Sequence, residues 1–184
     1  TKQQSLFSSL RPLFDHKLLT ILEQQHNYYL HAKQYAQSAS YIRSAHALCS
    51  TSPGVACDRI TIKHAAALYF TNDYSGALDM LSPFIDGNTT AQPSHMFMAY
   101  LISLSSDIGL CHQVTKDQLE PLATLDHESK HTAAIISAAT RAGHAAWAIG
   151  FGRKHSEHSD VRSRLALIEA YTLEKNAEQA DSRF

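Results

Sequence analysis

Hydrophobic positions return at intervals of three and four residues through most of the chain, and β-branched residues do not alternate with polar ones. This spacing is typical of amphipathic α-helices and argues against half-buried strands. The sequence therefore predicts an all-α fold that follows an N-terminal extension, residues 1–11. We expect helices over 12–32, 36–48, 58–70, 74–85, from 92 onward, 119–125, 128–141, 145–155, 161–173 and from 177 onward.

A short pattern recurs along these helices: a polar pair, an aromatic or apolar residue, two variable positions and a small residue. Its copies start at Lys33, Asn72, Gly143 and Lys175, with separations of 39, 71 and 32 residues. Because 71 is close to two periods, a degenerate copy is expected at 106–111, with Cys111 as its small residue. A period of roughly 35 residues predicts about five antiparallel helix pairs, irregular in the third, that bury their apolar stripes against neighbouring pairs.

The second copy carries a resemblance to the tetratricopeptide-repeat family. It rests on Tyr74, Ala77, Leu81 and Phe84, with Ala65 and Leu68 in the preceding helix. Two positions depart from the family pattern: His26 stands where Gly or Ala is usual, and Gly152 stands at a large-residue position. The resemblance implies an α/α superhelix in which residues 1–184 form one domain, and we expect this chain to be a fragment of a longer protein.

The resemblance also implies a non-enzymatic scaffold that binds another protein or peptide, as an assembly factor, a secretion-type chaperone or a subunit of a larger complex. Exposed repeat ends would allow self-association. The family's groove residues, carried over by position, are Glu23, Asn27, Arg59, Lys63, Lys130 and Arg162. Arg59 and Lys63 lie one helical turn apart and would suit a partner's carboxylate, although Glu23 adds a negative charge beside them. The alternative is that these are solvated charges on helix faces.

A second interpretation concerns the string His127-Glu128-Ser129-Lys130-His131, which matches the H-E-x-x-H pattern of zinc hydrolases. There His127 and His131 would bind zinc, Glu128 would be the general base, and Glu157 or His158 would be the third ligand. The polar neighbours instead favour a helix start at which His131 is solvated. We therefore expect no cofactor and no metal, with His127 and His131 as the alternative.

Charge and cysteine content limit the partners and the cellular location that the sequence predicts. Sixteen basic and seventeen acidic residues leave no basic excess for nucleic acid, and no apolar run is long enough for membrane insertion. The expected location is cytoplasmic, with export left open. Three cysteines, Cys49, Cys57 and Cys111, favour free thiols, but Cys49 and Cys57 flank a loop and would be able to pair in an exported protein.

Overall fold

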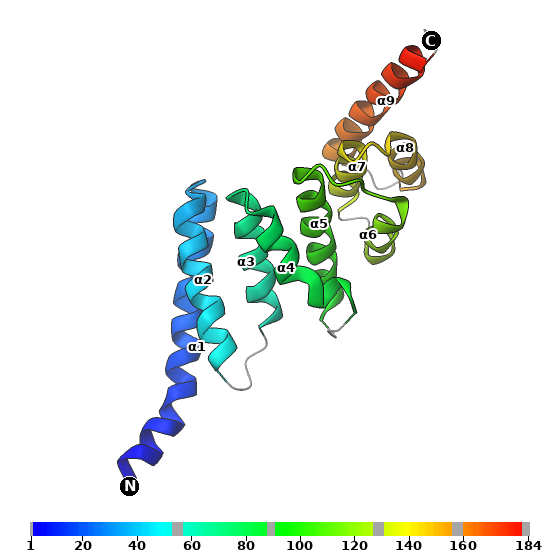
Figure 1. Ribbon diagram of the computed structural model, residues 1–184. Helices are drawn as coiled ribbons and strands as arrows, with labels where there is room; N and C mark the ends of the chain where they lie inside the picture. Colours follow the sequence, from blue (N-terminus) through cyan, green and yellow to red (C-terminus); the bar gives the residue numbers. More distant parts are fainter. Residues whose placement is uncertain (1, 53–56, 88–90, 127–130, 156–159, 182–184) are drawn as a thin grey trace. The chain divides into compact units, whose positions relative to one another are not determined.

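The computed structural model describes residues 2–52, 57–87, 91–126, 131–155 and 160–181, and Figure 1 shows that these are mainly helical. Their helices are α1 (Lys2–His31), α2 (Tyr35–Thr51), α3 (Asp58–Phe70), α4 (Tyr74–Ile85), α5 (Pro93–Gly109), the 3-10 helix η1 (Lys116–Gln118), α6 (Glu120–Leu125), α7 (Thr132–Arg141), α8 (Ala145–Lys154) and α9 (Val161–Asp181). No strand occurs in these ranges, so the all-α prediction is confirmed for them. None of the helices described is both long and apolar enough to cross a bilayer.

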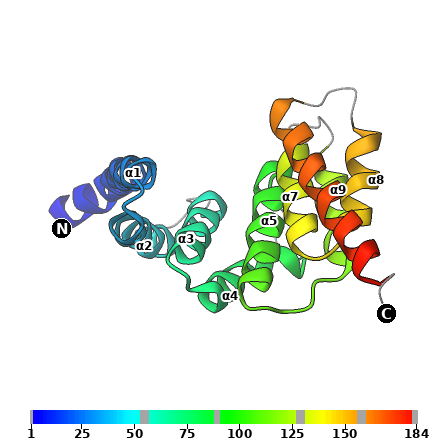
Figure 2. The same cartoon turned by 90° about the horizontal axis from the view of Figure 1, so that it is seen from above.

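The helices group into two compact units, Thr1–Ala91 and Gln92–Phe184. In the first unit α1 packs on α2, α2 on α3, and α3 on α4. In the second unit α7 packs against α5, α8 and α9, and α9 also lies along α8 (Figure 2). Each unit encloses its own apolar core, made largely of small and branched side chains such as Ala39, Ile42 and Ala45 in the first and Ile135, Ala138 and Ala148 in the second.

The same left-handed turn follows α1, α3, α5 and α7. Its central residue has a positive φ: 58° at Lys33, 64° at Asn72, 57° at Cys111 and 83° at Gly143. The next amide then donates to the carbonyl five residues earlier at 2.9 Å in all four turns: Gln34 to Tyr29, Asp73 to Leu68, His112 to Asp107 and His144 to Ala139. This is the Schellman arrangement, which satisfies the last carbonyls of a helix and reverses the chain.

The third copy of the pattern is shifted from its predicted register. Cys111 occupies the exposed turn position and is not a buried small residue, so the turns are separated by 39, 39 and 32 residues. After the other three turns a helix restarts two residues later, but after Cys111 no regular secondary structure occurs until η1. Thr115 and Gln118 form a capping box there, with the Thr115 amide 2.8 Å from Gln118 Oε1. The expected irregularity of the third pair is present in the structure.

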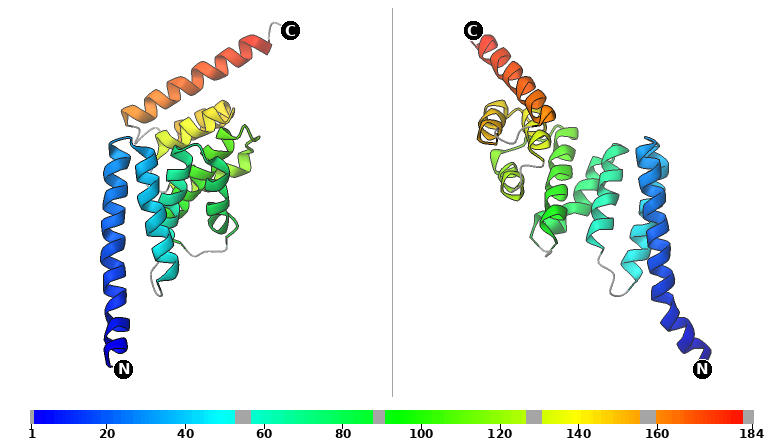
Figure 3. Two further views of the ribbon diagram at one scale, coloured as in Figure 1. Left: turned by 60° about the vertical axis from the view of Figure 1, so that its left-hand side comes forward. Right: turned by 180° about the vertical axis from the view of Figure 1, so that it is seen from behind.

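The largest departures from the predicted helix boundaries are in α1 and α9, whose course can be followed in Figure 3. Smaller ones are in α2, which ends at Thr51 and not at residue 48, and in α7, which begins at Thr132 and not at residue 128. Helix α1 begins at Lys2 and includes the segment expected to be an extension, because residues 2–11 contain good helix formers and Pro12 is accommodated inside the helix. Helix α9 runs without a break through Lys175, where a turn was expected. A left-handed lysine costs about 1 kcal/mol, and continuing the helix avoids that cost. The predicted fifth pair is therefore one helix.

The packing around Gly152 explains why glycine stands where the repeat pattern has a large residue. It lies on the buried face of α8, where an added Cβ would stand 2.9 Å from Leu167 Cγ on α9 and 3.0 Å from Ile136 Cδ1 on α7. A large residue is excluded there because α8 approaches both neighbouring helices closely. Gly150, on the exposed side of the same helix, has open space around the equivalent position.

A disulfide joins Cys49, at the end of α2, to Cys57, the residue before α3, with their Cα atoms 5.9 Å apart. The expectation of free thiols was wrong for this pair, and only Cys111 is free. The two cysteines bracket the connection that the chain makes between the first and second helix pairs. Because Cys49 is buried in the core of the first unit, the bridge also holds the start of α3 against that core.

We expect Gly152→Ala to destabilise the protein by about 1–3 kcal/mol, because the new methyl group overpacks the contact with Leu167. Gly150→Ala is the matched control on the same helix, and it should be neutral or stabilise by up to about 1 kcal/mol because alanine is the better helix former. Urea unfolding midpoints of the two variants provide the measurement. Equal stability for both would contradict the close packing of α8.

Reduction should destabilise the protein through the Cys49–Cys57 bridge. A loop of this size contributes about 2–3 kcal/mol, so dithiothreitol should lower the unfolding midpoint of the wild type. Cys57→Ser should show the lowered midpoint without reductant and no further response to it. Cys111→Ser should behave as the wild type. A wild-type midpoint that is insensitive to dithiothreitol would show that the bridge does not contribute.

Candidate functional site

Four of the six predicted groove residues meet between α1 and α3. The Glu23 carboxylate accepts from Arg59 Nη2 at 2.6 Å and from Lys63 Nζ at 3.1 Å, and Lys63 Nζ also lies 3.4 Å from Asn27 Oδ1. Glu23 is buried, whereas Arg59 retains 60% of its side-chain exposure. The residues come together because Glu23 and Asn27 are one turn apart on α1, as Arg59 and Lys63 are on α3.

This charged cluster is satisfied from within the chain. Both cations that were expected to hold a partner's carboxylate are already bound to Glu23, which takes the place that such a ligand would occupy. A buried carboxylate needs this compensation, since an unpaired charge at that depth is strongly unfavourable. The cluster therefore joins α1 to α3, and an incoming anion would have to compete with Glu23 for Arg59 and Lys63.

Of the other two predicted groove residues, the described part of the chain includes Arg162. Arg162 lies in the first turn of α9, in the second unit, and its side chain is exposed. Lys130 lies outside the described residues. The structure thus groups the four predicted residues of the first unit and assigns Arg162 to a separate surface.

The buried His26 is held by Ser38 of α2, on the side of α1 next to the charged cluster. The Ser38 hydroxyl donates to the His26 carbonyl at 3.0 Å, and His26 Nδ1 lies 2.8 Å from the same hydroxyl oxygen. Since the hydroxyl has one proton, Nδ1 carries the ring proton and donates it. Burial lowers the pKa of His26 from its usual value. The imidazole is therefore buried together with a small polar partner that accepts its Nδ1 proton.

His64 of α3 is the buried polar residue without such a partner. It is 7% exposed, and neither ring nitrogen has a hydrogen bond within the described part of the chain. Its ring centroid is 5.2 Å from that of His46 on α2. Burial is the main cause that lowers the pKa of His64 to about 4, and electrostatic interactions with His46 and Arg43 act in the same direction. The core of the first unit thus holds this imidazole in its neutral form at neutral pH.

Of the predicted zinc string, His131 is the residue that the structure describes. His131 precedes the first residue of α7, and its ring stacks on Phe97 of α5 with centroids 4.4 Å apart. Its amide donates to the buried Asp126 at 3.1 Å. His127, Glu128, Glu157 and His158 lie outside the described residues. Within the residues described, no group of three potential metal ligands comes together.

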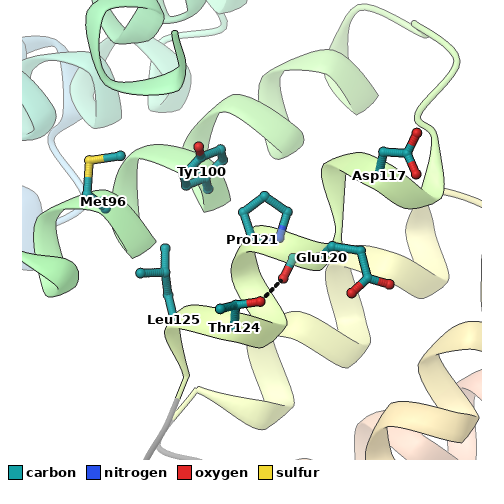
Figure 4. A pocket seen from close by; sticks show the side chains of 7 residues that line it. All are labelled: Met96, Tyr100, Asp117, Glu120, Pro121, Thr124 and Leu125. Atoms are coloured by element: carbon teal, nitrogen blue, oxygen red, sulfur yellow. Dashed lines mark hydrogen bonds between the residues drawn. The ribbon is translucent and has the colours of Figure 1, made fainter. Parts of the chain in front are cut away.

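Two surface features were not identified from the sequence. The outer face of α1 exposes a row of apolar side chains, which we call the α1 stripe: Phe14, Leu18, Ile21 and Tyr28. A cavity of about 450 Å³ also opens between α5 and α6 (Figure 4). The α1 stripe could have been recognised from the sequence, because the predicted first helix carries apolar residues on more than one face. The cavity could not, because it depends on how α6 packs against α5, which is a tertiary property.

Comparison of the chain with family models, curated proteins and solved structures finds no match to any of them. The function must therefore be argued from the residues and geometry of the chain itself.

The stability of the protein should fall as the pH drops from about 6.5 toward 4. Over this range the unfolded chain protonates His64 while the folded state keeps it neutral, so acid favours unfolding. The expected loss between pH 7.5 and pH 5 is about 2 kcal/mol from this residue, and His26 acts in the same direction. Urea midpoints across this pH range provide the measurement.

His64→Leu should remove most of this pH dependence, because the variant has no group to protonate at that position. His16→Asn, a change to an exposed histidine of α1, is the control and should retain the wild-type slope. If His64→Leu and the wild type lose stability in parallel, the buried imidazole is not the cause.

Proposed function

We propose that the protein is a non-enzymatic interaction scaffold of the tetratricopeptide-repeat type, an α/α superhelix that binds a segment of another protein. It would serve as an assembly factor, a secretion-type chaperone or a subunit of a larger complex. The observation that carries the proposal is the α1 stripe. Its members Phe14, Leu18, Ile21 and Tyr28 are 64%, 46%, 52% and 67% exposed, and apolar side chains grouped in this way mark interaction surfaces.

The spacing of the α1 stripe favours a helix as the binding partner. Phe14, Leu18, Ile21, Gln25 and Tyr28 follow one another at steps of four, three, four and three residues. This is the heptad spacing with which one helix presents a seam to another helix. Helix α9 repeats the same steps with the exposed residues Val161, Leu165 and Ile168.

The charges around the α1 stripe favour an acidic partner. The acidic side chains of α1 are both engaged within the unit: Asp15 accepts from the Ser52 hydroxyl at 3.0 Å, and Glu23 holds Arg59 and Lys63. The exposed charged residues described on this helix are consequently basic: Lys17, and Arg11, which also pairs with Asp15 at 3.8 Å. A second copy docked through the same face would oppose like charges, so we propose an amphipathic helix of a different protein with acidic residues beside its apolar seam.

Two observations help to choose between a scaffold and a zinc hydrolase, and between an exported and a cytoplasmic location. His131 is engaged with Phe97 and Asp126, which supports the scaffold over a zinc hydrolase. The Cys49–Cys57 disulfide favours an oxidising compartment, and therefore the exported location over the cytoplasmic one. A scaffold outside the cytosol would also gain most from a covalent link between its helix pairs.

The test is capture of partners from an extract of the source organism under oxidising conditions. Immobilised wild type should retain at least one protein that Ile21→Asp binds at least about tenfold more weakly, because a charge placed in the α1 stripe disrupts an apolar contact worth at least about 1.4 kcal/mol. The retained protein should contain an acidic amphipathic helix, and a peptide of that helix should compete for binding.

Thr20→Asp is the matched control, since it adds the same charge to an exposed position of α1 on a different side of the helix. It should bind as the wild type does. Retention of the same proteins by the wild type and by Ile21→Asp would refute the α1 stripe as the binding surface.

A further inference from the structure

The cavity between α5 and α6, here called the α5–α6 groove, has an apolar floor and an acidic end (Figure 4). Met96 and Tyr100 line it from α5, and Pro121 and Leu125 line it from α6. Thr124 also belongs to the lining, and its hydroxyl donates to the Glu120 backbone carbonyl at 2.9 Å, so it is turned toward its own helix. Asp117 and Glu120 complete the lining at one end.

The groove results from the irregular third pair. Helix α5 has seventeen residues, whereas α6, which packs against it, has six. In the second pair the returning helix restarts two residues after the turn, but here four residues without regular secondary structure, 112–115, precede η1. Part of the apolar surface of α5 is thereby left without a covering helix, and Met96 and Tyr100 remain only half-buried.

The carboxylates at the acidic end are available to a ligand. Asp117 on η1 and Glu120 on α6 are both exposed, and neither makes an ion pair within the described part of the chain. Lys116, next to Asp117 on η1, is basic but makes no ion pair with either carboxylate in the described part of the chain. Apolar surface beside two uncompensated acids is complementary to a segment that carries an apolar side chain and a cation together.

We propose that the α5–α6 groove is a second docking site, which binds a short segment of another protein with an apolar anchor about one helical turn from a lysine or arginine. The spacing follows from the lining: Met96 and Tyr100 are four residues apart on α5, as Pro121 and Leu125 are on α6, so the apolar floor is one turn long and ends at the acids. The site prefers the opposite charge from the α1 stripe. The scaffold therefore has two surfaces that distinguish their partners by charge.

The test uses labelled synthetic peptides and fluorescence anisotropy on the whole chain. A peptide of repeated KKLL units should bind, and a KKSS peptide of equal charge should bind at least about tenfold more weakly, because it lacks the apolar anchor. Asp117→Lys/Glu120→Lys should weaken KKLL binding about tenfold or more through loss of two charge contacts. Thr124→Trp, which fills the groove without changing its charge, should weaken it as well.

Asp79→Lys/Asp86→Lys is the matched control, because it makes the same charge change at exposed positions of the first unit. It should leave KKLL binding unchanged, provided that circular dichroism shows each variant to be folded. Ile21→Asp should also bind KKLL normally, so failure of the α1 stripe and failure of the groove are distinguishable.

Three results would overturn the proposal. In the first, KKLL binds the groove variants and the wild type equally well. In the second, KKSS binds as tightly as KKLL, which would reduce the site to a surface charge effect. The third would come from sedimentation velocity, if the wild type self-associates and Asp117→Lys/Glu120→Lys dissociates it. The occupant would then be a second copy, whose α1 carries Lys17 next to Phe14 and Leu18, and not another protein.

Discussion

The left-handed turn that closes α1, α3, α5 and α7 is the constraint on which the rest of the architecture depends. It sets a positive φ and a bond across five residues at the same relative position each time, so the chain reverses direction in a fixed way. Three of the four turn residues carry a side chain, at Lys33, Asn72 and Cys111. Each costs about 1 kcal/mol relative to glycine. The packing that follows the turn must offset that cost, which ties the turn to the helices it joins.

Packing within the first unit combines apolar burial with buried residues that can ionise, Glu23, His26 and His64. Glu23 is compensated by Arg59 and Lys63, and His26 by Ser38, so these residues follow the rule that buried polar atoms find partners. His64 departs from that rule. Neither ring nitrogen has a hydrogen bond in the described part of the chain, so burial of this neutral imidazole lowers the stability of the folded state. Because protonation would destabilise it further, the first unit is the acid-sensitive part of the chain that the structure describes.

Local signals in the sequence were sufficient for much of the fold. The helices at 58–70 and 74–85 were predicted to the residue, because Asp58 and Asp73 mark their starts and the apolar spacing between them is regular. The unbroken α9 could not be predicted from the repeat pattern, since Lys175 matches a turn position as well as Lys33 does. What differs is whether a following helix packs back, and that is a tertiary property. The disulfide was open for a similar reason: spacing permits a bridge, but only the positions of α2 and α3 bring Cys49 and Cys57 together.

The candidate site was predictable in its members but not in its chemistry. Position in the repeat brought Glu23, Asn27, Arg59 and Lys63 to one place, yet the sequence could not show that Glu23 satisfies both cations. A ligand is therefore better accommodated away from this cluster, because its charged residues already pair with one another inside the first unit. A regular helix pair covers its own apolar surface, whereas the third pair, with its late restart and short α6, cannot cover α5. The same shortfall that makes the repeat hard to recognise at Cys111 creates a concave apolar surface beside Asp117 and Glu120. Because the core of the second unit also includes residues of α5, α7, α8 and α9, the surface beside the short α6 stays open without loss of that core.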